Sequence, residues 1–157
     1  MSSPDTVIPP AARRNHWMNQ VAGHAAMRPD ATAFRFVGRE WTWGDVDGRM
    51  DRFAAALDRR GVTFGDRVLL LTLNRPEVVE AIFGINRIGA MAVPINFRLT
   101  PPEIAYIVDD ADASVIVVEA PLAPLVGAVA ALTDRIRTVI VIGEAGQGQE
   151  SFDDLAA

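Results

Sequence analysis

Asn96 and Arg98 are the residues of this chain whose types and position favour binding chemistry. They follow a short apolar run, Ala92–Ile95, that predicts a β-strand, and a predicted helix begins at Thr100 directly afterwards. Ligands of open α/β sheets collect at the carboxyl ends of the strands, and a helix N-terminus adds a positive field. Arg98 is therefore a candidate for binding an anionic group. The structural alternative is that its guanidinium holds the strand–helix turn through backbone carbonyls or Glu103.

Two other groups of polar residues are weaker candidates. The acidic cluster at residues 109–112 offers carboxylates that Mg²⁺ prefers, but it ends an apolar-striped helix, where acids usually face water. His16 and His24 are the only histidines, and no carboxylate lies at a spacing that implies a ligand set. No serine lies in the strand–turn–helix context of a hydrolase nucleophile. We therefore expect no catalytic residue and no metal site in this segment.

The groups that usually grip a triphosphate are also missing from the sequence. All fifteen basic residues are arginine, and lysine is absent. After the apolar run Val68–Leu73 the chain reads Asn74-Arg75-Pro76, where a nucleotide-binding sheet would place a glycine-rich turn with free N–H groups. Neither G-x-G-x-x-G nor G-x-x-x-x-G-K occurs. The sequence does not predict a self-sufficient nucleotide site.

Length and composition narrow the function classes. A chain of 157 residues suits one domain with a real core. The net charge of −5 argues against nucleic-acid binding, and the lack of cysteine excludes disulfides and thiolate metal sites. No secretory signal and no membrane-length apolar run is visible, so we expect a cytoplasmic protein. Arg13 and Arg14, beside Ile8 and Trp17, allow at most a peripheral contact with a membrane.

Periodicity and capping residues predict the elements around Arg98. An N-terminal helix is expected over Asn15–Arg28, a hairpin over Ala33–Thr42, and a helix capped by Thr42 and Asp45. Apolar runs about 23 residues apart then predict strands at Val68–Leu73, Ala92–Ile95, Val115–Val118 and Val139–Ile142. The predicted intervening helices are Pro76–Ile88, Pro101–Asp110 and Pro121–Leu132, with Asn74 and Thr100 as expected caps for the first two.

Strands that are apolar on both faces and separated by single helices predict an α/β fold. The expected architecture is a parallel, doubly wound sheet with flanking helices, preceded by the N-terminal helix and the hairpin. We place this α/β subdomain at residues 1–142. Residues 143–157 begin with the polar run GEAGQGQE and are interpreted as a linker.

Several short motifs, in this order, resemble the N-terminal region of the adenylate-forming (AMP-binding) acyl-CoA synthetases, or fatty-acid–CoA ligases. They are Pro29-Asp30-Ala31-Thr32-Ala33, Trp41-Thr42-Trp43-Gly44-Asp45, Gly61-Val62-x-x-Gly65-Asp66-Arg67-Val68, Asn74-x-Pro76-Glu77, Gly89-Ala90-Met91-Ala92-Val93-Pro94-Ile95-Asn96 and Arg98-Leu99-x-x-x-Glu103-Ile104. The motifs run through almost the whole chain, and most of them build scaffold. The resemblance therefore implies the incomplete N-terminal subdomain of that fold.

The resemblance also implies an activity for a longer parent protein. Such ligases use ATP, Mg²⁺ and CoA to convert a carboxylate, here expected to be a fatty acid, to acyl-AMP and then to acyl-CoA. Arg98 is similar to an arginine that faces a phosphate of CoA in some relatives. The serine-, threonine- and glycine-rich phosphate loop and the lysines of the family have no counterpart here, and residues 143–157 would lead towards that loop. We therefore expect this segment alone to be inactive and to bind no cofactor.

Two alternative functions stay open at this point. The chain could be a stand-alone interaction or dimerisation module derived from such a ligase, and a homodimer would fit that reading. It could instead be an unrelated small-ligand-binding doubly wound domain. The acyl substrate and its chain length cannot be read from these residues.

Overall fold

The computed structural model describes residues 18–157, and its elements follow the predicted order. The helices are α2 (Met18–Met27), α3 (Trp43–Asp58), α4 (Pro76–Arg87), α5 (Pro101–Asp110), the 3₁₀ turn η1 (Ala120–Leu122), α6 (Ala123–Ala130) and α7 (Phe152–Ala156). The strands are β1 (Thr32–Phe36), β2 (Arg39–Thr42), β3 (Arg67–Leu71), β4 (Met91–Pro94), β5 (Val115–Glu119), β6 (Thr138–Ile142) and β7 (Glu150–Ser151).

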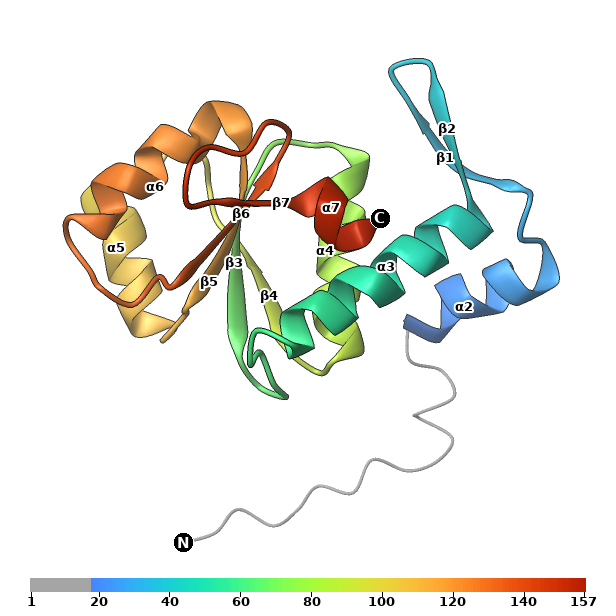
Figure 1. Cartoon of the computed structure of the whole chain (residues 1–157), viewed down its shortest axis with the longest axis horizontal. Helices are drawn as coiled ribbons and strands as arrows, with labels where there is room; N and C mark the ends of the chain where they lie inside the picture. The colour runs from blue at the N-terminus through green and yellow to red at the C-terminus, as the bar shows by residue number, and fades with distance from the viewer. Residues whose placement is uncertain (1–17) are drawn as a thin grey trace, which may run out of the picture.

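A five-stranded parallel sheet forms the centre of the molecule (Figure 1). Its strand order is β4-β3-β5-β6-β7, and every neighbouring pair is parallel. From β3 the chain first moves outward to β4 and then crosses back over β3 to β5. This reversal places a topological switch point between β3 and β5. The predicted α/β fold with a doubly wound parallel sheet is confirmed.

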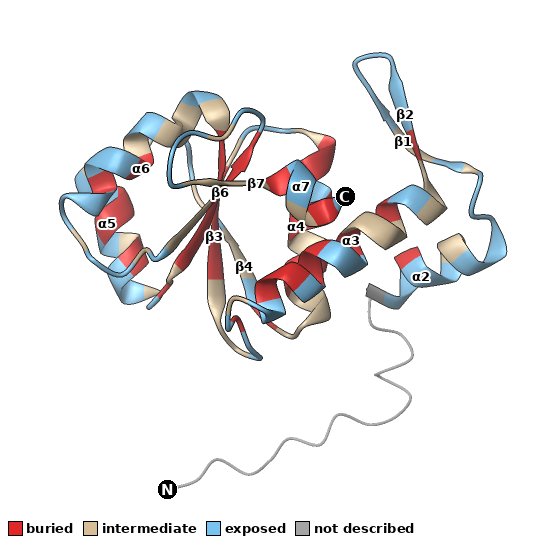
Figure 2. Cartoon of the chain, in the orientation of Figure 1, coloured by how far each residue is buried: buried red, intermediate tan, exposed pale blue. Residues whose placement is uncertain are grey.

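Helices cover both faces of the sheet, so the central strands are buried on both sides (Figure 2). On one face, Val68 and Leu70 of β3 pack in a cluster with residues of α3, α4 and α7. On the other face, Leu69 and Leu71 pack with residues of α5 and α6. This arrangement explains why β3 and β5 are continuous apolar runs in the sequence, without the alternation of a half-exposed strand.

The local signals around α3 and α5 are confirmed. The Thr42 hydroxyl accepts a hydrogen bond from the Asp45 N–H at 3.1 Å, and the Asp45 carboxylate accepts one from the Thr42 N–H at 3.2 Å. At α5 the Glu103 carboxylate accepts from the Thr100 N–H at 2.8 Å, and this bond lowers the pKa of Glu103. Gly61 follows α3 with a φ of 80°, the left-handed conformation expected after a helix.

Asn74 is not the cap of α4, contrary to the prediction. The N-cap is Arg75, which makes no side-chain capping hydrogen bond. Proline favours the first helical position, so the residue directly before Pro76 is the N-cap. The same rule places Thr100 correctly before Pro101.

Residues 143–157 are not simply the linker that we predicted. After the segment 143–149, β7 adds a fifth strand beside β6, and α7 then packs against α3. Phe152 is fully buried, and the centroid of its ring lies 4.6 Å from the centroid of the Phe53 ring. A two-residue strand has no detectable periodicity, which explains why the sequence alone did not predict it.

The predicted start of the first helix, at Asn15, lies outside the described residues, within which α2 covers Met18–Met27. β4 is an edge strand and Met91 is exposed, so the strand before Arg98 is less buried than expected. Proline has no N–H to donate, but Pro94 is tolerated in this edge strand. The N–H groups of Met91 and Ile95 donate towards β3, and since these groups alternate in direction along a strand, position 94 faces away from β3. Among residues 18–157 no helix is long and apolar enough to cross a bilayer.

Gly84 allows α3 and α4 to approach closely. A Cβ atom at this position would lie 2.8 Å from the buried Phe53 ring and 3.2 Å from the Met50 carbonyl oxygen. We expect Gly84→Ala to destabilise the fold by about 1–3 kcal/mol through overpacking. Chemical denaturation measures the change. Gly127→Ala in α6 is the matched control, because a Cβ atom there would meet nothing within 4 Å and the helix should gain about 0.5–1 kcal/mol. Equal stability of the two variants would contradict the close-approach role.

Candidate functional site

The carboxyl ends of β3 and β5 meet at the switch point, which is where open α/β sheets usually bind ligands. The chain leaves β3 through residues 72–75 and enters α4 at Pro76. Glu119 is the last residue of β5 and is buried. The chemistry of this crevice is therefore set by Glu119 and by the turn that leads into α4.

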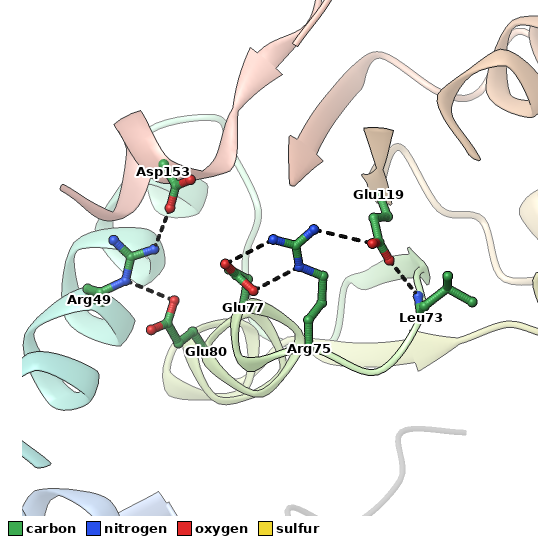
Figure 3. A network of polar contacts seen from close by, with 7 residues as sticks. All are labelled: Arg49, Leu73, Arg75, Glu77, Glu80, Glu119 and Asp153. Carbon is green, nitrogen blue, oxygen red and sulfur yellow. Dashed lines mark hydrogen bonds and ion pairs between the residues drawn. The ribbon is translucent and has the colours of Figure 1, made fainter. Parts of the chain in front are cut away.

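Arg75 joins two carboxylates across the switch point (Figure 3). Its Nε and Nη2 atoms donate to the two oxygens of Glu77 at 3.0 and 3.2 Å, and Nη1 donates to Glu119 at 3.2 Å. The other oxygen of Glu119 accepts from the Leu73 N–H at 2.9 Å. The hydrogen bond with Glu77 raises the pKa of Arg75, so this guanidinium stays charged and paired.

A second set of charges joins α4 to α3 and α7. The Arg49 Nε donates to Glu80 at 2.9 Å, and its Nη2 donates to Asp153 at 2.8 Å (Figure 3). The Glu80 side chain is fully buried, and its Oε1 atom has no hydrogen-bond partner within the part of the chain that the structure describes. Burial raises the pKa of Glu80, against the opposing effect of Arg49.

Together these contacts make the switch point unsuitable for a triphosphate. Glu77, Glu80 and Glu119 are buried acids. Together with Asp153 they place four carboxyl groups against the two guanidinium groups of Arg49 and Arg75. A bound polyphosphate would have to displace a carboxylate from Arg75 and then lie beside it. The residues of this segment therefore do not fit the phosphates of ATP at the switch point, in agreement with the absence of a glycine-rich turn.

Arg98 lies beyond the end of β4, on the exposed stretch that leads to α5. Its backbone N–H donates to the Asn96 side chain at 3.0 Å, and its guanidinium lies 5.4 Å from the centre of the Phe97 ring. The guanidinium forms no ion pair within residues 18–157, and Glu103, the partner in the structural alternative, is engaged by Thr100. Arg98 thus presents an available positive charge to solvent, and its binding role stays a prediction.

The other candidates do not assemble into a site. Asp109 and Asp112 pair with Arg135, and Asp112 also lies 3.7 Å from Arg67. His24 packs on Trp43 with ring centroids 4.5 Å apart, whereas His16 and the Arg13-Arg14 pair lie outside the described residues. Within residues 18–157 no group of three or more potential ligands could hold a metal ion.

The buried acids were not predicted from the sequence, although a signal for them existed. Glu77 and Glu80 share a helical stripe with Ala81, Gly84 and Ile85, which is the buried face of α4. An acid on a buried stripe requires a cationic partner. The partner itself was not identifiable, because Arg49 lies 31 residues away and is one of fifteen arginines.

Comparison with known proteins gives a consistent result. Residues 21–156 match the family described as AMP-binding enzyme. The chain is 40% identical over 107 residues to a feruloyl-CoA synthase of Amycolatopsis sp., covering 68% of the chain and 22% of that protein. It is 38% identical over 123 residues to the long-chain-fatty-acid–CoA ligase FadD13 of Mycobacterium tuberculosis, covering 78% of the chain and 24% of that protein.

Solved structures agree with this assignment. The N-terminal domain of FACL13 from Mycobacterium tuberculosis superimposes with a TM-score of 0.76 at 29% identity, over 89% of this chain and 34% of that one. The chain thus belongs to the AMP-binding enzyme family, and the resemblance to the N-terminal region of acyl-CoA synthetases is confirmed. It spans about a fifth to a quarter of the length of the curated relatives that it matches.

The pairing of Arg49 with Glu80 should be essential for stability. We expect Arg49→Leu to destabilise the fold by about 3 kcal/mol, because it leaves the buried Glu80 carboxylate without its cation. Denaturant unfolding measures this change. The double variant Arg49→Leu/Glu80→Leu should recover most of the loss, and Arg59→Leu, at an exposed position, should stay within about 0.5 kcal/mol of the wild type. A double variant as unstable as the single one would show that the pair is not the cause.

Proposed function

We propose that this chain is the N-terminal part of an ATP-dependent acyl-CoA ligase, an acid–thiol ligase that forms an acyl-AMP and then an acyl-CoA. Membership in the AMP-binding enzyme family supports this proposal. The observation that carries it is the match of 89% of the chain to the N-terminal domain of FACL13. The relatives named above act on a long-chain fatty acid and on an aromatic acid, so a fatty-acid substrate for this chain is the finer part of the proposal.

In the proposed division of labour, this segment supplies scaffold and one contact with CoA. The switch point is held by Arg75 and its two carboxylates, so the groups that bind ATP and Mg²⁺ belong to other parts of the ligase. The exposed guanidinium of Arg98 fits a phosphate group of CoA. When bound, CoA supplies the thiol that receives the acyl group. We also propose that the ligase is cytoplasmic.

The isolated chain should have no adenylating activity. Incubation with ATP, Mg²⁺, CoA and a panel of aliphatic and aromatic carboxylates is expected to release no pyrophosphate, because the switch point offers no available cation to a triphosphate. The complete gene product is the control, and it should catalyse carboxylate-dependent ATP–pyrophosphate exchange. Turnover by the isolated chain would contradict the scaffold role, and a complete gene product without exchange would contradict the ligase assignment.

Arg98→Ala in the complete gene product tests the contact with CoA. We expect the KM for CoA to rise about three- to tenfold, since a charge-assisted contact at an exposed position is weaker than a buried one. ATP–pyrophosphate exchange, which precedes the use of CoA, should stay near normal. Arg59→Ala, an exposed arginine at the C-terminal end of α3, should change neither quantity. An unchanged KM for CoA would remove this assignment.

A further inference from the structure

Residues 120–132, which form η1, α6 and the turn that follows, contain no charged side chain and no side chain that can form a hydrogen bond. The inward face of α6 carries Val126 and Val129, which are buried in the cluster with β3 and β5. The outward face is exposed, and it consists of Pro124, Gly127, Ala128, Ala130 and Ala131. A helix that is apolar on all sides is usually buried on all sides, so a further surface is expected to cover α6.

The neighbouring helix α5 covers the same face of the sheet but has a different outward face (Figure 1). Its exposed residues include Glu103, Asp109 and Asp110, which is the polar surface expected of a helix in contact with water. Two large side chains of this helical layer are also exposed, Tyr106 in α5 at 70% and Leu132 just after α6 at 54%. Exposed apolar surface gathered on one layer marks an interaction site more often than scattered exposed residues do.

Opposite charges lie near the two ends of α6. Glu144 is near its start, because a Cβ atom on the preceding Gly143 would lie 3.2 Å from the Cβ atom of Ala120. Arg137 lies beyond its end, at the amino edge of the sheet, where its backbone N–H donates to the Ser114 carbonyl at 2.8 Å. The side chains of Glu144 and Arg137 are exposed, and neither forms an ion pair within residues 18–157. A surface with an acid near one end of a helix and a base near the other is complementary to an inverted copy of itself.

Charge and side-chain size favour a second copy of the chain as the occupant. The exposed acids Asp110 and Asp134 border this layer without an ion pair among the described residues, and they would oppose an anionic lipid surface or a nucleic acid. In a two-fold contact the same surface is used by both copies. With the two α6 helices antiparallel, Glu144 of each copy would lie towards Arg137 of the other. The outward side chains of α6 are no larger than proline, so the two helices can approach closely.

We propose that α6 is the centre of a two-fold interface between two copies of this chain, with the two α6 helices antiparallel. One short helix and its neighbours offer a small contact area, so the dimer is weak and reversible. Dimerisation through α6 does not require the ligase activity proposed above, because none of its contacts involves Arg75 or Arg98.

Sedimentation velocity over a series of protein concentrations tests the interface, with Ala128→Glu as the disrupting variant. We expect a monomer–dimer equilibrium for the chain, and Ala128→Glu should raise the dissociation constant at least about tenfold, because it buries a carboxylate without a partner in the dimer. Ala55→Glu is the matched control, since Ala55 is an exposed alanine on α3, on the other side of the sheet. It should leave the dissociation constant within about twofold of the wild type. Both alanines are exposed in the monomer, so neither change should alter its circular dichroism spectrum.

Charge reversal tests the antiparallel arrangement independently of the apolar centre. Glu144→Arg alone, or Arg137→Glu alone, would bring like charges together at two symmetry-related places. Each should raise the dissociation constant about three- to tenfold. The double variant Glu144→Arg/Arg137→Glu restores opposite charges between the copies, so its dissociation constant should return to within about twofold of the wild type.

Several results would overturn the proposal. They are a chain that stays monomeric up to about 0.5 mM, a dimer that Ala128→Glu leaves intact, and a double charge reversal that does not restore dimerisation. A dimer that Ala55→Glu dissociates equally would place the contact on the other side of the sheet. Binding of the monomer to phosphatidylglycerol vesicles that Ala128→Glu abolishes would identify a membrane as the occupant. A fall of about 4 °C or more in the Tm of the complete gene product with Ala128→Glu, without a change of mass, would place another part of that protein on α6.

Discussion

The pairing of Arg75 with Glu77 and Glu119 is the contact on which the arrangement of the sheet edge depends. Glu119 also accepts the Leu73 N–H, so one side chain from β5 fixes the direction in which the chain leaves β3. That direction sets the start of α4, and the buried stripe of α4 then packs against α3 at Gly84. A polar contact at the end of an otherwise apolar core thus orients the chain where α4 begins, and the apolar clusters on both faces of the sheet hold the layers together.

Elements with a local signal were predictable from the sequence. The strands β3 and β5 are continuous apolar runs, and each is bounded by residues that stop a strand or begin a helix. The Thr42–Asp45 and Thr100–Glu103 caps need only residues three apart, so their geometry is contained in the sequence itself. The position of Arg98 after β4 was predicted for the same reason.

Features that depend on distant residues were not predictable. β7 is too short to show a periodicity, and it is held in place by contacts made far away, such as the pairing of Glu150 with Arg60, 90 residues earlier. The ion pairs around α4 also depend on residues that are distant in the sequence. Their acids lie visibly on a buried stripe, but the sequence alone does not say which arginine reaches each of them.

The distribution of charge along the carboxyl edge of the sheet supports the proposed scaffold role of this segment. At the carboxyl ends of β3 and β5, Arg75 is already paired with the buried acids Glu77 and Glu119. The excess of negative charge there would repel a phosphate. At the end of β4 the single guanidinium of Arg98 is exposed and makes no ion pair among residues 18–157. An anion approaching this edge is therefore disfavoured at the switch point and favoured at β4. That gradient is compatible with a CoA phosphate bound at the margin and with nucleotide phosphates bound by other parts of a ligase.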